Sequence, residues 1–331
     1  MYNKALALDP GNAKLYVNRS DIYLTVLTHI LRAQAYRYLG RLGESIEDLG
    51  RAISLEPALA AALEKEPCLA TGMSLDGHMA TAFTTRGQAY DEQRRYYAAL
   101  SDYNIALKRD PNQIEAYGSR AGTYVRMGRY EDALVDAGRA ISVNPHLAAA
   151  YDVRALAYVG LGQNKEALTN ASIAIELDAG YAMAYSNRAY INTGLGNYSQ
   201  AVTDATKAME LEPEMASAYA NRAEASYMAG DYERAISDST AALRLDHTLT
   251  LTLIGRVRSY LAKKEYSRAV DDANLVLSTN PGQLEARYVR GRALLESTAG
   301  LRGREDLDKI IQFSQNSALV KLAQRALSAS Q

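Results

Sequence analysis

The chain has 331 residues, of which 48% are hydrophobic, so it has enough apolar material for a sizeable core. Its 37 basic and 38 acidic residues give a formal net charge of −1, which speaks against the basic surface expected of a nucleic-acid-binding protein. The single cysteine, Cys68, excludes an internal disulfide framework and favours a reducing compartment. The longest apolar run, residues 22–31, is too short to span a bilayer, and no signal peptide is recognisable, so we expect a cytoplasmic protein without a membrane span.

The first 12 residues predict the end of a helix that stops at Pro10, because proline cannot continue a helix. Residues 1–12 would then be a partial repeat whose first helix is missing. Two explanations stay open: the chain is a fragment of a larger protein, or it has a short N-terminal lead-in.

Residues 13–59 predict an irregular repeat that contains one long helix. No glycine or proline lies between Asn12 and Gly40, so nothing in the sequence breaks this helix. The helix carries an apolar stripe that consists of Ile22, Leu27, Ile30 and Leu31. We favour packing of the stripe against the next hairpin; the alternative is self-association through the N-terminal end, because exposed apolar patches often mark interfaces.

Residues 60–79 have no equivalent elsewhere in the chain. Pro67, Gly72 and Gly77 predict an irregular insertion loop. We favour a tolerated surface loop, since lengthening a loop costs little entropy. A binding loop is the alternative, because insertions in repeat proteins often lie on the binding face.

From residue 80 onward the sequence repeats with a period of 34 residues, which marks a chain built by stacking one supersecondary unit. Six regular repeats occupy 80–283 and a degenerate repeat follows at 284–316. An amphipathic helix at 317–331 is predicted to cap the stack. The clearest mark of the period is a series of arginines, namely Arg86, Arg120, Arg154, Arg188, Arg222, Arg256 and Arg290.

Each regular repeat predicts two helices joined by a short turn. In the central repeat, Tyr185 and Arg188 lie three residues apart on one face of the first helix. Gly196 ends this helix, since glycine readily adopts the left-handed conformation that reverses the chain. Asn197 is then predicted to cap the second helix in a capping box with Gln200.

This pattern resembles the tetratricopeptide repeat, a 34-residue helical hairpin with an early aromatic residue, a glycine turn, an alanine in the second helix and a terminal proline. One departure is the absence of tryptophan from the chain, so that tyrosine or Phe83 takes the aromatic position. The resemblance implies an all-α fold, a right-handed superhelical solenoid of antiparallel helix hairpins. Because the period is continuous, we expect a single solenoid over residues 1–331.

An acidic series accompanies the arginines, with one aspartate in the second helix of most repeats. A guanidinium can grip a carboxylate with two hydrogen bonds, so we interpret the two series as a structural ladder that forms where hairpins pack. A row of guanidiniums offered to an acidic ligand is the alternative. The predicted ladder comprises Arg120, Arg154, Arg188, Arg222, Arg256, Asp136, Asp204, Asp238 and Asp272, and Asn170 replaces aspartate in one repeat.

Little in the sequence supports catalysis. Among the four histidines, only His78 shares a segment with Cys68, and no oxyanion or orienting motif accompanies this pair. The sequence has no glycine-rich phosphate loop, no paired-cysteine spacing and no His-Glu zinc motif. We therefore expect a non-enzymatic protein that uses no cofactor and no metal.

The positions that vary between repeats indicate a ligand-binding face. In the first helix of each repeat, places 2, 5, 6, 9, 12 and 13 vary, and most of them follow helical spacing, so they form one free face. In the family that the chain resembles, this face lines a concave groove that holds peptides. The predicted groove residues are Asp152, Leu156, Met183, Ser186, Asn187, Tyr190, Ala220, Asn221, Glu224 and Tyr227.

One subfamily of tetratricopeptide repeat co-chaperones clamps an acidic tail with lysine, asparagine and arginine side chains from three repeats. Asn187 matches the central asparagine of that clamp, and Asn221 matches it one repeat later. The surrounding places hold neither lysine nor arginine, so the sequence does not support a carboxylate clamp.

We therefore predict a non-enzymatic scaffold that binds a peptide segment of a partner protein in the groove. The start of the chain within a repeat supports a second hypothesis, a regulatory repeat domain of a larger protein. A third, an RNA-binding helical repeat, is disfavoured by Asp152, Glu224 and the balanced charge, so no nucleic-acid partner is expected.

Overall fold

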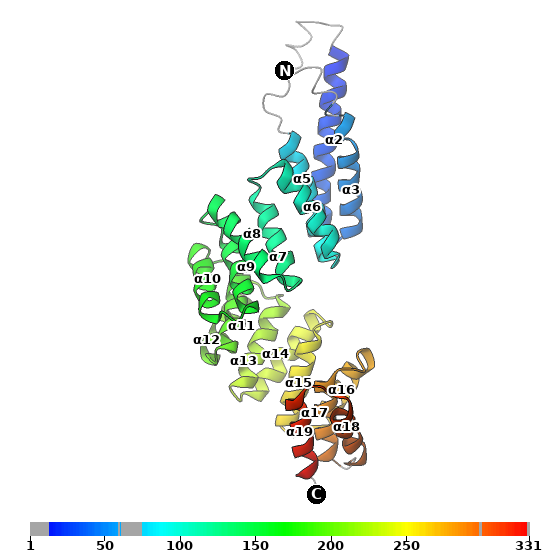
Figure 1. The fold of residues 1–331 in the computed structure, drawn as a ribbon, viewed down its shortest axis with the longest axis vertical. Helices are drawn as coiled ribbons and strands as arrows, with labels where there is room; N and C mark the ends of the chain where they lie inside the picture. Colours follow the sequence, from blue (N-terminus) through cyan, green and yellow to red (C-terminus); the bar gives the residue numbers. More distant parts are fainter. Residues whose placement is uncertain (1–12, 59, 61–74, 298–299, 330–331) are drawn as a thin grey trace. The chain divides into compact units, whose positions relative to one another are not determined.

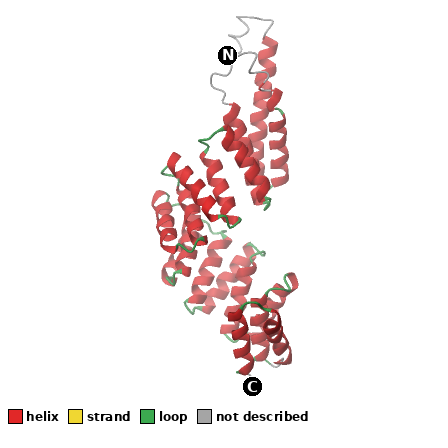
Figure 2. Cartoon of the chain, in the orientation of Figure 1, coloured by secondary structure: helices red, strands yellow, loops and turns green. Residues whose placement is uncertain are grey.

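The computed structural model describes residues 13–58, 60, 75–297 and 300–329 (Figure 1). These residues form 17 helices and no strand (Figure 2). The prediction of an all-α fold is therefore confirmed. The partial repeat predicted at 1–12, and all but the ends of the insertion predicted at 60–79, lie outside the described residues.

The chain divides into two compact units, of which the first is Met1–Gln163. Its helices pack in chain order, so that each hairpin lies on the next one. The helices of this unit are α2 (Ala13–Tyr38), α3 (Leu42–Ser54), α5 (Leu75–Glu92), α6 (Tyr96–Arg109), α7 (Ile114–Arg126), α8 (Tyr130–Val143) and α9 (Ala148–Gly160).

The second unit is Asn164–Gln331 and repeats the same packing of successive helices. In chain order it begins with α10 (Asn164–Leu177), α11 (Ala182–Gly194), α12 (Tyr198–Leu211), α13 (Ala216–Met228) and α14 (Tyr232–Leu245). The remaining helices are α15 (Thr250–Ala262), α16 (Tyr266–Thr279), α17 (Leu284–Leu295), α18 (Gly300–Phe313) and α19 (Ser317–Ser328).

Helix α2 runs without a break over 26 residues, as the lack of glycine and proline predicts. Its core side is buried together with residues of α3 and α5, and Ile30 is 3% exposed there. Leu31, which belongs to the same predicted stripe, is instead 64% exposed. The stripe is therefore divided between the core and the surface, because neighbouring residues on a helix point about 100° apart.

Helix α5 begins at Leu75, inside the segment predicted to be an insertion loop. The loop prediction is therefore wrong for residues 75–79. Met79 is fully buried in the core shared by α2, α3 and α5. Burial of this side chain outweighs the low helix propensity of Gly77, which weakens a helix by only about 1 kcal/mol.

Turns between paired helices use a residue with positive φ. Gly196 and Gly230 have φ values of 80° and 85°, which confirms the predicted glycine turns. At the same place of other repeats, Arg94 and Lys264 adopt φ values of 60° and 62°. The turn geometry is thus set by the packing of the two helices and is imposed even on residues with a Cβ atom.

The capping box predicted for α12 is wrong. The side chain of Asn197 makes no capping hydrogen bond and donates instead to Asn192 Oδ1 at 3.3 Å. Gln200 donates to Asp204 Oδ1 at 3.3 Å, because the buried carboxylate competes for its amide group. In α14, by contrast, Asp231 accepts a hydrogen bond from the backbone of Arg234 at 3.1 Å.

Helix α19 covers the last hairpin. Its Ala323 is fully buried against Leu307 and Ile310 of α18. Side chains of α17 pack against the same cluster, including Tyr288 and Leu295.

Candidate functional site

The arginine series forms two-pronged ion pairs with the aspartate series. Arg222 donates through Nε to Asp238 Oδ2 at 2.8 Å and through Nη2 to Asp238 Oδ1 at 2.9 Å. The same geometry joins Arg86 to Asp102, Arg120 to Asp136, Arg188 to Asp204, Arg256 to Asp272 and Arg290 to Asp306.

These pairs join the two helices of one hairpin, since the arginine and the aspartate are 16 residues apart in the same repeat. The sequence predicts that the arginine–aspartate pairs form between neighbouring hairpins, and this prediction is wrong: each pair lies within one hairpin. Contact between hairpins is made by the remaining nitrogen: Arg222 Nη1 donates to Thr206 Oγ1 of the preceding hairpin at 3.1 Å. Equivalent bonds run from Arg120 to Asn104, Arg188 to Ser172, Arg256 to Thr240 and Arg290 to Asn274.

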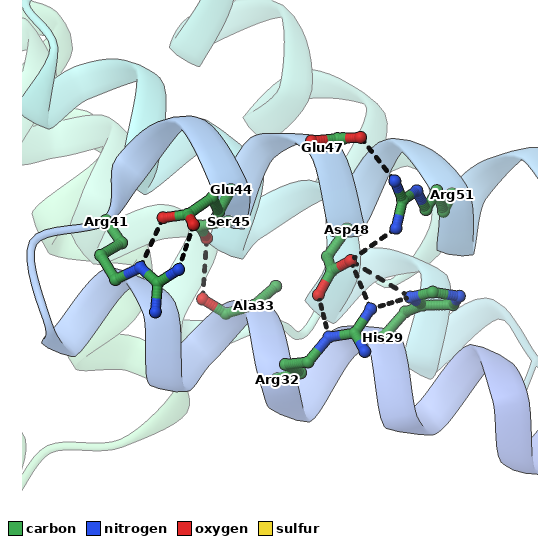
Figure 3. Close-up of polar contacts among 9 residues, drawn as sticks. All are labelled: His29, Arg32, Ala33, Arg41, Glu44, Ser45, Glu47, Asp48 and Arg51. Atoms are coloured by element: carbon green, nitrogen blue, oxygen red, sulfur yellow. Dashed lines mark hydrogen bonds and ion pairs between the residues drawn. The ribbon is translucent and has the colours of Figure 1, made fainter.

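Figure 3 shows the corresponding pair in the first hairpin, where Arg32 of α2 binds Asp48 of α3. His29 and Arg51 approach the same carboxylate, at 3.4 Å and 3.6 Å. The hydrogen bonds from Arg32 hold the pKa of Asp48 below its ordinary value, against the opposing effect of burial.

The ladder carboxylates are buried and already bound by arginines, so they are not available to bind a ligand. The side chains of Asp204 and Asp238 are 2% and 6% exposed. Hydrogen bonding to Asp238 raises the pKa of Arg222 above its ordinary value, so this guanidinium stays charged and paired. These contacts support the structural interpretation of the ladder. Arg154 and Asn170 lie in different units, and the place of Arg154 in the ladder stays a prediction.

Two of the predicted groove residues are buried, so the prediction is wrong for them. Asp152 is 2% exposed and Ser186 is 0% exposed. Asn221 of α13 donates to the backbone oxygen and the hydroxyl of Ser186 at 2.9 and 3.0 Å. Ser186 and Asn221 thus join adjacent first helices, because small polar residues allow close packing and satisfy each other there.

Other predicted groove residues reach the surface. Met183 and Tyr190 of α11 are 40% and 53% exposed. The half-buried Glu224 accepts a hydrogen bond from Arg258 at 2.5 Å, and Arg258 lies over the ring of Tyr227 at 4.6 Å from its centroid. The remaining three, Leu156, Asn187 and Ala220, are all partly exposed.

A pocket of about 750 Å³ lies in the second unit, where α15, α17 and α19 meet. Its apolar walls include the rings of Tyr227 and Tyr288 and the side chains of Leu261, Leu319 and Leu322. Its polar lining consists of Arg258, Lys264, Glu285, Arg292, Glu296 and Asn316. We call this hollow the C-terminal pocket. A neighbouring hollow of about 380 Å³ shares Tyr288, Arg292, Glu296 and Leu322 with it.

Local structure fixes the walls of the C-terminal pocket. Asn316 caps α19 by accepting hydrogen bonds from the backbone of Ala318 and Leu319 at 3.1 and 3.2 Å, which sets where α19 begins. Arg258 is held between Glu224 and Glu285, at 2.5 and 3.5 Å.

The C-terminal pocket has a hydrogen-bond donor that no described residue uses, the guanidinium of Arg292. This guanidinium makes no side-chain hydrogen bond or ion pair to the described part of the chain. Burial raises the pKa of Tyr227, so its phenol keeps its proton at neutral pH. The pocket therefore combines apolar walls with donors that suit carbonyl or carboxylate oxygens.

The C-terminal pocket lies on places that the repeat pattern marks as free. Arg258, Leu261 and Ala262 are places 9, 12 and 13 of α15, and Glu285, Tyr288, Val289 and Arg292 are places 2, 5, 6 and 9 of α17. Variation at these places between repeats is a sequence signal that also marks these residues in the last two repeats. The contribution of α19 could not be found in this way, because α19 lies outside the period.

No group of three or more His, Cys, Asp or Glu side chains in the described part of the chain could hold a metal ion. None of the helices there is long and apolar enough to cross a membrane. Cys68 lies outside the described residues, and His78 lies in α5, 3.4 Å from the hydroxyl of Tyr23.

Helix hairpins that repeat every 34 residues and pack each on the next define a helical-repeat protein. The tetratricopeptide repeat models match residues 28–59, 84–145 and 193–246. The chain is a tetratricopeptide repeat protein. No curated protein sequence matched it.

Solved structures agree on the fold. A tetratricopeptide repeat protein from Parabacteroides merdae aligns with a TM-score of 0.54 at 18% identity, covering 76% of this chain and 100% of that one. A thermophilic one from Thermus thermophilus gives 0.50 at 25% identity, with 55% and 98% covered. The human IFIT1 dimer with m7Gppp-AAAA gives 0.63 at 14% identity, with 92% and 81% covered.

Proposed function

We propose that the chain binds a peptide segment of a partner protein on the free face of its first helices, with the main contact in the C-terminal pocket. The tetratricopeptide repeat fold is generally an interaction scaffold rather than a catalytic one. The observation that carries the proposal is the position of the pocket: it lies on the variable places of α15 and α17.

The size and lining of the pocket support a peptide as the ligand. Its volume of about 750 Å³ lies within the range of roughly 300–1,000 Å³ that is usual for ligand sites. The rings of Tyr227 and Tyr288 offer area to an apolar side chain, and aromatic and arginine residues are enriched where binding energy concentrates. Arg292 can donate to a backbone carbonyl or an acidic side chain of the peptide.

A selection from a random 12-residue peptide display library on the immobilised chain tests the proposal. Selected peptides would be measured by fluorescence anisotropy against the wild type and Arg292→Glu. We expect the substitution to weaken binding at least about tenfold, which corresponds to about 1.4 kcal/mol. Because Arg292 has no ion-pair partner among the described residues, the change breaks no observed internal bond.

Two further variants make the result specific. Arg244→Glu applies the same charge change at an exposed position of α14 and should leave binding unchanged. Tyr190→Ala tests the part of the face formed by α11. Loss of binding in Tyr190→Ala alone would move the peptide from the C-terminal pocket to α11. Equal binding by the wild type, Arg292→Glu and Tyr190→Ala would reject the proposal.

A further inference from the structure

Helix α2 exposes an apolar seam on its outer face. Leu24, Leu31 and Tyr38 follow one another at intervals of seven residues and are 57%, 64% and 82% exposed. Thr28 and Ala35 lie between them and are exposed as well. The spacing of these five residues alternates between three and four, which is the pattern of a helix that packs along a second helix.

Two of the five seam residues take places that are buried in most other repeats. When Arg32 is aligned with the ladder arginines, Thr28 and Ala35 take places 3 and 10 of the first helix. Both places are buried in other first helices, at Ala82 and Ala89, Ala116 and Thr123, Ala184 and Ile191, Ala218 and Ala225, and Ala286 and Ala293. In α13 they pack on the preceding hairpin, Ala218 with Ala182 and Ala208, and Ala225 with Ala189 and Ala205. Thr28 and Ala35 thus take repeat-packing places with no hairpin of the described chain upon them, and Leu24, Leu31 and Tyr38 extend this apolar surface along α2.

The seam has a hollow at one end and a large ring at the other. A hollow of about 410 Å³ is lined by Leu24, Thr25, Thr28, His29 and Arg32. Tyr38 lies seven residues beyond Leu31, and Leu24 lies seven residues before it. A two-fold axis at Leu31 would therefore place Tyr38 of one chain at the hollow beside Leu24 of another, with the two Leu31 side chains in contact.

Charge does not oppose this arrangement. Arg32 is paired with Asp48, and Arg37 is paired with Glu92 at 2.8 Å. Two copies of the seam would therefore meet without an unpaired arginine from either of these positions. Antiparallel helices also oppose their dipoles, which favours the two-fold arrangement.

We propose that the seam binds a second copy of this chain, with the two α2 helices antiparallel about Leu31. A partner must offer a helix of matching length with the same seven-residue period. Helix α2 has 26 residues, whereas the other helices of the described residues have 12–18, so a second α2 meets both conditions within this chain. A two-fold interface also uses the same patch on both subunits, as this seam requires.

Sedimentation velocity over a series of protein concentrations tests the proposal on the full chain. The average mass of the wild type should rise from monomer toward dimer as the concentration increases. Leu31→Glu should remain monomeric, because it places two carboxylates opposite each other at the axis, and Leu31→Lys should do the same with two ammonium groups. An equimolar mixture of the two variants should recover the dimer.

Leu275→Glu is the matched control, since it changes a leucine of α16 that is 55% exposed and lies outside the seam. It should dimerise like the wild type. Circular dichroism checks that all variants are equally helical. A wild type that stays monomeric throughout, a Leu31→Glu variant that dimerises like the wild type, or a mixture that stays monomeric would each overturn the proposal. Failure here leaves peptide binding untouched, because the C-terminal pocket lies in the other unit.

Discussion

Each fully engaged ladder arginine joins three helices through one guanidinium. Two nitrogens of Arg222 donate hydrogen bonds to Asp238 in its own hairpin, and the third donates to Thr206 in the preceding hairpin. A lysine could not reproduce this geometry, because an ammonium group lacks the rigid fork of the guanidinium. The arginine therefore fixes both the pairing of helices within a repeat and the contact between repeats.

Removing Arg222 should destabilise the second unit. Arg222→Met leaves the carboxylate of Asp238, only 6% exposed, without its counter-ion, and we expect a loss of about 3 kcal/mol. Asp238→Leu in the same chain should restore part of this loss, since no unpaired charge then remains. Urea unfolding followed by circular dichroism gives both values. A double variant at least as unstable as Arg222→Met would show that burial of the carboxylate is not the cause.

The first hairpin should respond to acid through Asp48. The pKa of this carboxyl is lowered in the folded protein, mainly by hydrogen bonds from Arg32, so the folded state binds the proton less tightly than the unfolded state. The resulting stabilisation is complete above the ordinary carboxyl pKa of about 4 and is lost as the pH falls through the folded pKa.

Thermal unfolding of the wild type and Asp48→Asn over a pH series measures this effect. At neutral pH the variant should be less stable, and the gap should narrow as the pH falls below about 4. A gap that stays constant down to the acid limit of folding would contradict the assignment to Asp48.

At the scale of one hairpin, the turn determines how the two helices meet. Gly196 and Gly230 adopt the left-handed conformation without cost to a side chain, whereas Arg94 adopts it with φ of 60°. A residue with a Cβ atom loses about 1–2 kcal/mol there. Part of this loss is offset because glycine has more freedom in the unfolded chain.

We therefore expect Arg94→Gly to stabilise the α5–α6 hairpin by about 0.5–1 kcal/mol. Arg94 is exposed and makes no side-chain hydrogen bond to the described residues, so little else is lost. Urea unfolding of the variant checks the sign. The reverse change, Gly196→Ala, should destabilise its hairpin by a similar amount, and a stabilising Gly196→Ala would refute the explanation.

For the whole molecule, stability should be local. Among the described residues of the second unit, each hairpin packs on its neighbours in the chain and on no distant element. Arg222→Met should therefore increase amide hydrogen exchange in α12, α13 and α14 and leave α2 and α3 unchanged. Exchange mass spectrometry resolves these segments. A uniform increase along the chain would show that the hairpins unfold as one cooperative body.

The sequence alone predicts the helices of the repeats well, because the 34-residue period aligns equivalent residues and turn glycines. It also predicts that arginines pair with aspartates, since both series keep the same spacing. The second partner of each arginine escaped detection because its identity changes: Asn104, Ser172 and Thr206 hold equivalent places. A search by residue type finds no series there, although all three accept a hydrogen bond.

The candidate site was less predictable. Variable places indicate which side of a first helix is free from repeat packing, but Ser186 is variable and still buried, because a small side chain lets the next helix approach. The C-terminal pocket also needs Leu319 and Leu322 of α19. That helix breaks the period, and periodicity cannot tell where a helix outside it will pack.

The spacing of the ladder contacts has a consequence for the length of the stack. Every guanidinium that has all three bonds finds its partners 16 residues before it and 16 residues after it, a span shorter than one 34-residue repeat on either side. Deleting residues 216–249 would bring Arg256 beside Thr206 in place of Thr240, one threonine for another, while its bond to Asp272 stays within its own hairpin. Whole repeats can thus be gained or lost without leaving a ladder arginine unmatched, so the number of hairpins can change in steps of one while the contacts between hairpins stay the same.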